Sequence, residues 1–258
     1  MITTWWGLAL LAVGVSAAAM VVTALVARRV GRVSVVDVTW GLALVAIALA
    51  MAVAGTATTW RRWVVLVLVA VWGCRLAWHI WTRSRGKGED PRYTELLDGG
   101  GFGVAVRKVF LTQGVVICLI GLPLVAAGHS DVAWWPPVVV GVVVWAVGVV
   151  FETVGDAQLA SYKRDPERGP VMDRGLWAWT RHPNYFGDAC LWWGIWLAGG
   201  AASGWLQALV TVVSPIAMTY FIRNVTGAKL LEKTMSTRPG WDAYAARVPL
   251  FFPRPPRR

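Results

Sequence analysis

Polar residues able to do chemistry are concentrated in the nine-residue stretch TRHPNYFGD, residues 180–188. Pro183 suits the first position of a helix, where its missing N–H does no harm. Thr180 or Asn184 offers a capping oxygen. Asn184 and Asp188 are four residues apart and share a helix face. A helix N-terminus suits an anion, and a structural cap needs one polar residue, whereas this stretch has an Arg, a His, an Asn, a Tyr and an Asp beside Thr180. We therefore predict a functional site here.

Two further sets of polar residues lie within apolar segments. Asp37 is followed by Trp40 on the same helix face, and Trp72, Arg75 and His79 share a face of a later segment. Ionisable side chains within a membrane span are costly and usually mark function. Two alternatives stay open. Asp37 is either functional or an interfacial carboxylate stabilised by the helix dipole, and Arg75 either contacts a ligand or pairs with Asp37.

A basic segment follows the fifth apolar run. Asp156 continues that helix out of the membrane, and three cations come after it: Lys163, Arg164 and Arg168. A solvated loop and a phosphate site are both compatible with this pattern, since Lys and Arg bind phosphate oxygens.

The elements that carry these residues are apolar helices. The 258 residues are 57% hydrophobic and 15% charged, below the quarter that is typical of soluble domains. Several apolar runs approach the roughly 20 residues needed to cross a bilayer. The sequence predicts an all-α polytopic membrane protein with one domain and seven transmembrane helices. The predicted spans are residues 5–27, 33–54, 63–82, 109–127, 134–153, 184–199 and 205–222.

The basic residues predict the orientation. Of 25 Lys and Arg residues, 22 lie in four segments that fall on one side if the spans alternate. Cytoplasmic loops carry such an excess, so we expect the N-terminus outside and the C-terminus in the cytoplasm. Arg61 and Arg62 are exceptions. The net charge of +11 fits this bias and an attraction to anionic membrane lipid. Nucleic-acid binding is not expected, because the cations are spread over short loops.

Cysteine and histidine spacing predicts neither a disulfide nor a metal site. Cys74, Cys118 and Cys190 lie within predicted spans without a CxxC pair, and the three His residues are far apart. The sequence also lacks the glycine-rich dinucleotide fingerprint and the phosphate-binding loop of nucleotide-binding folds. A dinucleotide would therefore bind without a Rossmann sheet.

Three stretches resemble the C-terminal signature of the steroid 5-alpha-reductase superfamily: RGLWAWTRHPNYFGD, LLEK and WDAYAARVPLFFP. They are most similar to its bacterial branch, a domain of unknown function, as are VDVTWG and WGCRLAWHIWTRSRGKGEDPRY. The first stretch also resembles the signature of sterol C14 and C7 reductases. The resemblance implies seven spans, a cytosol-facing NADPH site and hydride transfer to a C=C bond.

The resemblance also implies residue roles. Asn184 matches a residue at the nicotinamide end of the cofactor, and Asp188 matches its acidic partner. Arg75 matches a cofactor-contacting Arg, and Tyr244 matches a cofactor-contacting Tyr. The full set of predicted cofactor residues is Arg75, Asp156, Lys163, Arg164, Arg174, Arg181, His182, Asn184, Asp188, Glu232 and Tyr244.

The sequence departs from the steroid enzymes at the substrate residues. Asp37 and Trp72 stand where those enzymes have a Glu and a Tyr that hold the substrate carbonyl. An indole donates a hydrogen bond but does not titrate. The predicted substrate residues are Asp37, Trp40 and Trp72. The predicted sources of the proton are Asp37, Tyr185 and Asp188.

Two functions follow from these residues. The first is an NADPH-dependent reductase of a lipophilic alkene that enters from the bilayer, with its active site facing the cytoplasm. The alternative is a methyltransferase that uses S-adenosylmethionine, similar to the isoprenylcysteine carboxyl methyltransferases. Those enzymes share an Arg-His-Pro-x-Tyr turn and usually carry a Glu-Glu pair, whereas this chain has Glu232 followed by Lys233.

Overall fold

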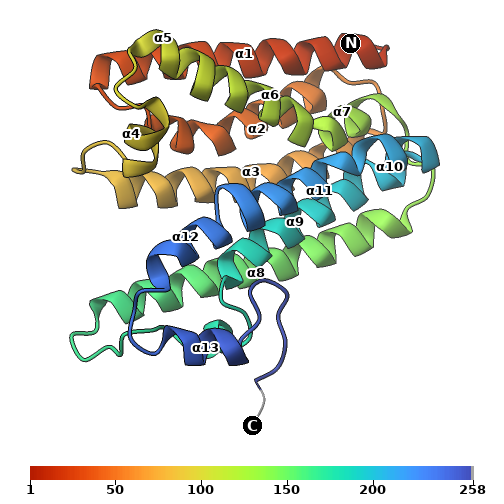
Figure 1. Ribbon diagram of the computed structural model, residues 1–258. Coiled ribbons are helices and arrows are strands. Elements are labelled where there is room, and N and C mark those ends of the chain that lie inside the picture. Colours follow the sequence, from red (N-terminus) through yellow and green to blue (C-terminus); the bar gives the residue numbers. More distant parts are fainter. Residues whose placement is uncertain (257–258) are drawn as a thin grey trace. The chain divides into compact units, whose positions relative to one another are not determined.

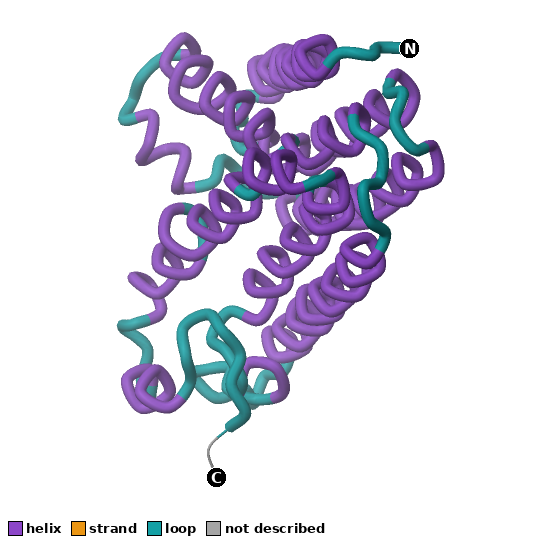
Figure 2. Tube along the Cα trace, turned by 90° about the vertical axis from the view of Figure 1, so that its right-hand side faces the viewer, coloured by secondary structure: helices purple, strands orange, loops and turns teal. Residues whose placement is uncertain are grey.

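The computed structural model describes residues 1–256, and these residues form helices and loops without a strand (Figure 2). They divide into two compact units. The first unit comprises Met1–Val138 and Ile195–Ser214, and the second comprises Val139–Gly194 and Pro215 onward.

Among residues 1–256, six helices are long and apolar enough to cross a membrane. Four are continuous: α1 (Trp5–Val30), α2 (Val35–Ala54), α3 (Thr59–Ser84) and α8 (Pro136–Arg164). The segment Phe102–Ile120 combines α5 (Phe102–Ala105), the π-helical η1 (Val106–Leu111) and α6 (Thr112–Ile120). The segment Trp205–Met235 combines α10 (Trp205–Thr211), α11 (Val213–Tyr220), η4 (Phe221–Val225) and α12 (Ala228–Met235). The prediction of an all-helical membrane protein is confirmed at this level.

The remaining described elements are shorter. They are α4 (Pro91–Leu97), α7 (Leu122–His129), η2 (Gly175–Ala178), α9 (Pro183–Gly199), η3 (Ala201–Ser203) and α13 (Trp241–Arg247). The predicted span at 184–199 coincides with α9, which has 17 residues.

In the first unit, α1 runs antiparallel to the segment formed by α5, η1, α6 and α7 (Figure 1). The Trp5 and His129 rings meet at one end, with centroids 5.9 Å apart. In the middle, the Ser16 hydroxyl donates to the Gly114 carbonyl at 3.0 Å. At the other end, the Arg28 guanidinium lies over the Phe102 ring. The pairing therefore runs along the length of α1.

The two arginines that violate the charge bias are buried in the first unit. Arg61 is fully buried and donates to the Ser203 hydroxyl at 2.8 Å and to the Ala127 carbonyl at 3.1 Å. Arg62 is 8% exposed and donates to the Ala52 carbonyl at 2.7 Å. Carbonyls in the last turn of a helix lack intrahelical donors and carry negative partial charge. Arg61 therefore stabilises the C-terminal end of α7, and Arg62 stabilises the C-terminal end of α2.

Six exposed tryptophans lie at one end of the first unit, where α1, α3 and α10 begin and where a loop leads from α7 to α8, whereas Trp78 and Trp81 are exposed near the opposite end of α3. These six residues are Trp6, Trp60, Trp63, Trp134, Trp135 and Trp205. Tryptophan is enriched at membrane–water boundaries because the ring is apolar and the N–H is polar. The position of these rings fits a boundary at this end of the helices.

In the second unit, α8 and α9 pack antiparallel along a row of glycines. A Cβ at Gly187 would lie 2.5 Å from the Gly148 carbonyl oxygen, and one at Gly194 would lie 2.5 Å from the Gly141 carbonyl oxygen. Gly155 continues the row, and its Cβ would lie 3.2 Å from a backbone nitrogen of α9. Small residues of this kind let membrane helices approach backbone to backbone. We call these five residues the glycine row.

A methyl group in the glycine row should force the two helices apart. In Gly148→Ala the added Cβ meets the backbone nitrogen of Leu191 at 2.5 Å. We expect a loss of about 1–3 kcal/mol of unfolding free energy, in the range of overpacked cores, measured as a lower thermal midpoint in detergent. The control is Gly14→Ala in α1, where a Cβ meets nothing within 4 Å. Equal midpoints for the two variants would contradict the close packing.

Candidate functional site

The segment after α8 is fastened to it by two hydrogen bonds. The Gln158 side chain accepts from the Leu176 N–H at 3.0 Å, and the Trp177 indole donates to the Gly155 carbonyl at 3.1 Å. The Tyr244 hydroxyl then donates to the Trp177 carbonyl at 2.7 Å. These bonds fix η2 on α8 and α13 on η2, all within the second unit.

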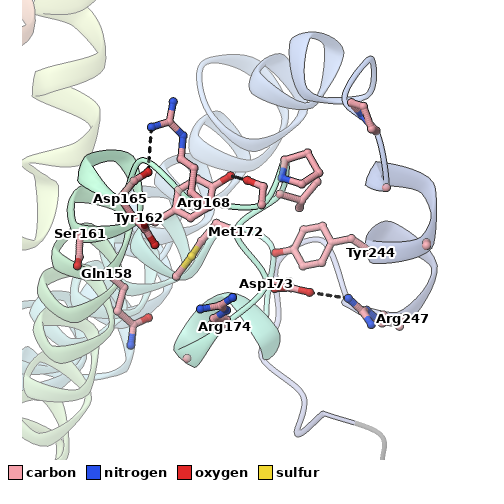
Figure 3. Close-up of a pocket in the computed structure, with 17 residues that line it drawn as sticks. Gln158, Ser161, Tyr162, Asp165, Arg168, Met172, Asp173, Arg174, Tyr244 and Arg247 are labelled. Atoms are coloured by element: carbon pink, nitrogen blue, oxygen red, sulfur yellow. Dashed lines mark hydrogen bonds and ion pairs between the residues drawn. The ribbon is translucent and has the colours of Figure 1, made fainter.

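A hollow of about 600 Å³ lies among these elements. It is lined by the end of α8, by the loop that leads to η2 and by α13 (Figure 3). The lining includes the rings of Tyr162 and Tyr244. It also includes three cations and two acids, namely Arg168, Arg174, Arg247, Asp165 and Asp173. This volume is within the range of small-molecule and cofactor sites.

The three arginines of this hollow differ in their partners. Arg247 pairs with Asp173 at 2.7 Å, and Arg168 donates to the Lys163 carbonyl at 2.8 Å. The Arg174 side chain has no recorded hydrogen bond or ion pair within residues 1–256. Arg174 is therefore the cation of the lining that is available to an anionic ligand.

A second set of predicted residues meets at Glu232 of α12. The Glu232 carboxylate lies 2.9 Å from Arg181 Nε and 3.1 Å from His182 Nε2. His182 is 2% exposed, and its ring stacks on that of Tyr185 with centroids 5.6 Å apart and planes at 12°. Arg181 also donates to the Ala245 carbonyl at 3.1 Å. Glu232 thus holds the two residues that precede α9, and we call these four side chains the Glu232 cluster.

Asn184 lies beside the Glu232 cluster at the start of α9. Its Nδ2 donates to Asp156 Oδ1 at 3.1 Å. Its Oδ1 is buried and has no hydrogen-bond partner within the described part of the chain. A buried carbonyl oxygen left unpaired costs free energy, so Asn184 presents an acceptor that suits an N–H donor of a ligand.

The other predicted residues of the second unit differ in how far they are buried. Tyr244 lines the hollow with its ring, and burial raises the pKa of its phenol, which keeps it as a neutral donor to Trp177. Lys163 and Arg164 lie exposed at the end of α8. Asp188 is half-buried on α9, and its role stays a prediction.

In the first unit, Asp37 is held by two residues of α4 that sequence reasoning missed. The Tyr93 hydroxyl donates to Asp37 Oδ1 at 2.5 Å, and Arg92 pairs with Asp37 Oδ2 at 3.0 Å. Burial, followed by the Asp37 carboxylate, raises the pKa of Tyr93, so this phenol stays protonated. The sequence feature that could have indicated Tyr93 is the Asp90–Pro91 pair, which is typical of a helix start. A helix that begins there has Tyr93 in its first turn, as α4 does.

The predicted substrate residues of α2 and α3 also meet within the first unit. The Trp40 and Trp72 rings pack edge to face with centroids 5.9 Å apart, and Trp72 is fully buried. Arg75 is half-buried one turn after Trp72 on α3. The indole of Trp72 thus has a core position, and its contact with substrate stays a prediction.

Residues 23–248 match the model of a family described as "Protein of unknown function (DUF1295)". The chain belongs to the DUF1295 family. The match includes the predicted site residues of both units, from Asp37 to Tyr244. No curated protein and no solved structure matches the chain.

The Glu89 carboxylate holds α4 of this DUF1295 chain near the start of α2. It accepts from the backbone N–H of Val33, from that of Ser34 at 3.0 Å and from that of Asp90 at 3.0 Å. Partial burial alone would raise the pKa of Glu89, but the hydrogen bonds from Ser34, Val33 and Asp90 hold it below its ordinary value of 4.5. The charged form is therefore the one that stabilises this connection.

Replacing Glu89 should change how stability depends on pH. A lowered pKa stabilises the folded state above pH 4.5, and this contribution is lost as the pH falls through the folded-state pKa. We expect Glu89→Gln to lower the thermal midpoint at about pH 7 and to differ less from the unmodified protein at about pH 4. A midpoint difference that stays constant over this interval would contradict the role of the charge.

Proposed function

We propose that the chain is an integral-membrane, NADPH-dependent reductase that transfers a hydride to a C=C bond of a lipophilic substrate. The observation that carries the proposal is the hollow of about 600 Å³ with the available guanidinium of Arg174. The resemblance of residues 174–188 to the steroid 5-alpha-reductase superfamily agrees with it. The substrate class comes from that resemblance and from the apolar helices.

The lining of the hollow suits the phosphate-bearing end of a dinucleotide. Arg174 and Arg168 offer guanidinium N–H groups, which bind phosphate oxygens at paired positions. The half-buried ring of Tyr162, with the Arg168 guanidinium 6.0 Å from its centroid, is the aromatic group of the lining that would stack on a base. Asp165 adds a carboxylate of the kind that accepts from ribose hydroxyls. Each part of this end of the cofactor thus has a complementary group.

The start of α9 suits the nicotinamide end. The unpaired Asn184 Oδ1 would accept from the carboxamide N–H of the cofactor, while Asp156 keeps the Asn184 side chain oriented. Asp156 precedes Gln158 of the hollow by two residues on α8. The Glu232 cluster would fix the backbone that leads into Asn184. When bound, NADPH supplies the hydride, and Tyr185, Asp37 and Asp188 remain the predicted sources of the proton.

The methyltransferase alternative has one observation in its favour. Glu232 pairs with Arg181 and His182, and these residues belong to the turn and the acidic position that the isoprenylcysteine carboxyl methyltransferases share. Charge argues for the reductase. S-adenosylmethionine has no phosphate and carries a positive sulfonium, whereas the lining of the hollow has three arginines against two acids and leaves Arg174 available to an anion.

The proposal includes a membrane topology. We assign α9 as a seventh span in addition to the six long apolar helices of a bacterial inner-membrane protein. Its N-terminus would lie outside and its C-terminus in the cytoplasm. The distribution of 22 of the 25 basic residues among four segments supports this assignment. The hollow would then face the cytoplasm, where NADPH is available, and the substrate would enter from the bilayer.

Removing the polar groups of the cofactor site should weaken NADPH binding. We expect Asn184→Ala to abolish it and Arg174→Gln to weaken it about tenfold to hundredfold, because a hydrogen bond to a charged group contributes on the order of 1.5–3 kcal/mol. The measurement is titration of the purified protein with NADPH, followed by nicotinamide fluorescence.

A matched variant separates this site from general charge effects. Lys229→Gln removes one positive charge from an exposed position of α12 in the same unit, and we expect it to bind NADPH as the unmodified protein does. Unchanged affinity in Asn184→Ala, with its thermal midpoint also unchanged, would remove Asn184 from the site. Equal losses in Arg174→Gln and Lys229→Gln would remove Arg174.

A further inference from the structure

A second hollow lies in the first unit, apart from the residues of the cofactor site. It has a volume of about 300 Å³ and is lined by Gly101, Gly103, Val104 and Arg107. These residues begin the apolar segment Phe102–Ile120, where α5 lies beside the C-terminal end of α1 (Figure 1). A Cβ built on Gly101 or Gly103 meets nothing within 4 Å. Both glycines therefore border open space.

The charges around this hollow are positive and lack acidic partners. Arg107 lines it, and the Arg107 guanidinium has no recorded hydrogen bond or ion pair over residues 1–256. The Arg28 guanidinium lies 5.6 Å from the ring centroid of Phe102. In the sequence, Phe102 stands between the two glycines that line the hollow, Gly101 and Gly103. Asp98, the nearest acid in sequence, forms no recorded ion pair with these cations within the described residues.

The hollow lies where an apolar, exposed surface gives way to cations. Along the same segment, Val106 is 40% exposed, Leu111 62% and Val115 63%. On α1, Leu25 lies one turn before Arg28 and is also exposed. Apolar exposed side chains suit acyl chains, and cations at the end of a span suit the anionic headgroup level of a leaflet.

The backbone of this segment supports the arrangement. Val106–Leu111 forms a π-helical turn, which includes Arg107. Turns of this kind are uncommon and often occur at functional sites. Lys108 donates to the Leu96 carbonyl at 2.9 Å, so Lys108 fixes α4 while its neighbour Arg107 remains available.

We propose that this hollow binds the phosphodiester headgroup of an anionic phospholipid. Arg107 and Arg28 contact the phosphate oxygens, and the acyl chains follow the exposed apolar residues of η1 and α6. An anionic headgroup is favoured over a zwitterionic one because the ammonium of phosphatidylcholine would lie among cations. The site does not depend on the proposed reductase activity.

The test compares lipid retention in phosphatidylcholine nanodiscs that contain a minor fraction of phosphatidylglycerol. Native mass spectrometry of the released protein counts the bound lipids. We expect retained phosphatidylglycerol, and an affinity about thirtyfold lower in the double variant Arg28→Gln/Arg107→Gln, since each cation at an anionic surface contributes about a fivefold effect. The control Arg85→Gln/Lys87→Gln removes the same charge from the exposed loop after α3 and should retain the lipid.

A steric variant tests the hollow without changing the charge. Gly103→Leu fills open space and favours the helix, so it should fold and lose the bound phosphatidylglycerol. Equal lipid loss in both charge variants would show diffuse attraction and overturn the site. Retention in Gly103→Leu, equal retention of phosphatidylcholine, or displacement of the lipid by inorganic phosphate would also overturn it.

Discussion

The backbone-to-backbone packing of α8 on α9 is the constraint on which the candidate cofactor site depends. The glycine row brings the two helices so close that a single Cβ at Gly187 would lie 2.5 Å from the opposite carbonyl oxygen. Because of this approach, Asn184 at the start of α9 reaches Asp156 on α8. The same part of α8 holds η2 through Gln158 and Gly155. A larger separation would disconnect these contacts.

The charged side chains fall into two groups by their partners. Arg61 and Arg62 donate to carbonyls at helix ends, Glu89 accepts from backbone N–H groups, and Glu232 pairs with Arg181 and His182. These groups have hydrogen-bond or ion-pair partners within the fold, and a buried charge requires partners of this kind. Arg174 and Arg107 lie at hollows and have no such recorded partner among residues 1–256. This difference, rather than net charge, marks the candidate anion sites.

Hydropathy predicted the helices because the length and polarity of a span are properties of contiguous residues. The predicted spans at 5–27 and 33–54 correspond to α1 and α2 for this reason. Pro183, which suits the first position of a helix, likewise predicted the start of α9, which begins at this residue. Asn184 does not supply the expected capping oxygen there, because it lies inside the helix and its Oδ1 has no partner among the described residues. Neighbouring residues are therefore enough to predict where these helices begin and end.

Partners that are distant in sequence could not be predicted in the same way. Tyr93 and Asp37 are 56 residues apart, and His182 and Glu232 are 50 residues apart. Glu232 was predicted as a cofactor residue, but its contacts with Arg181 and His182 depend on how α12 packs. The unpaired state of Asn184 Oδ1 also depends on which groups surround it in the fold, so the sequence alone does not predict it. Pairing across the fold is decided by packing geometry, which a pattern of residue types does not contain.

Hydride transfer itself tests the proposed function most directly. The purified protein would be incubated with a bacterial membrane lipid extract and NADPH deuterated at the transferring carbon of the nicotinamide, and the lipids analysed by mass spectrometry. The proposed reductase activity predicts a lipid that has lost one C=C bond and gained one deuterium. A parallel incubation would supply S-adenosylmethionine with a labelled methyl group. Transfer of that methyl group to a lipid, with no deuterium incorporated from NADPH, would contradict the account.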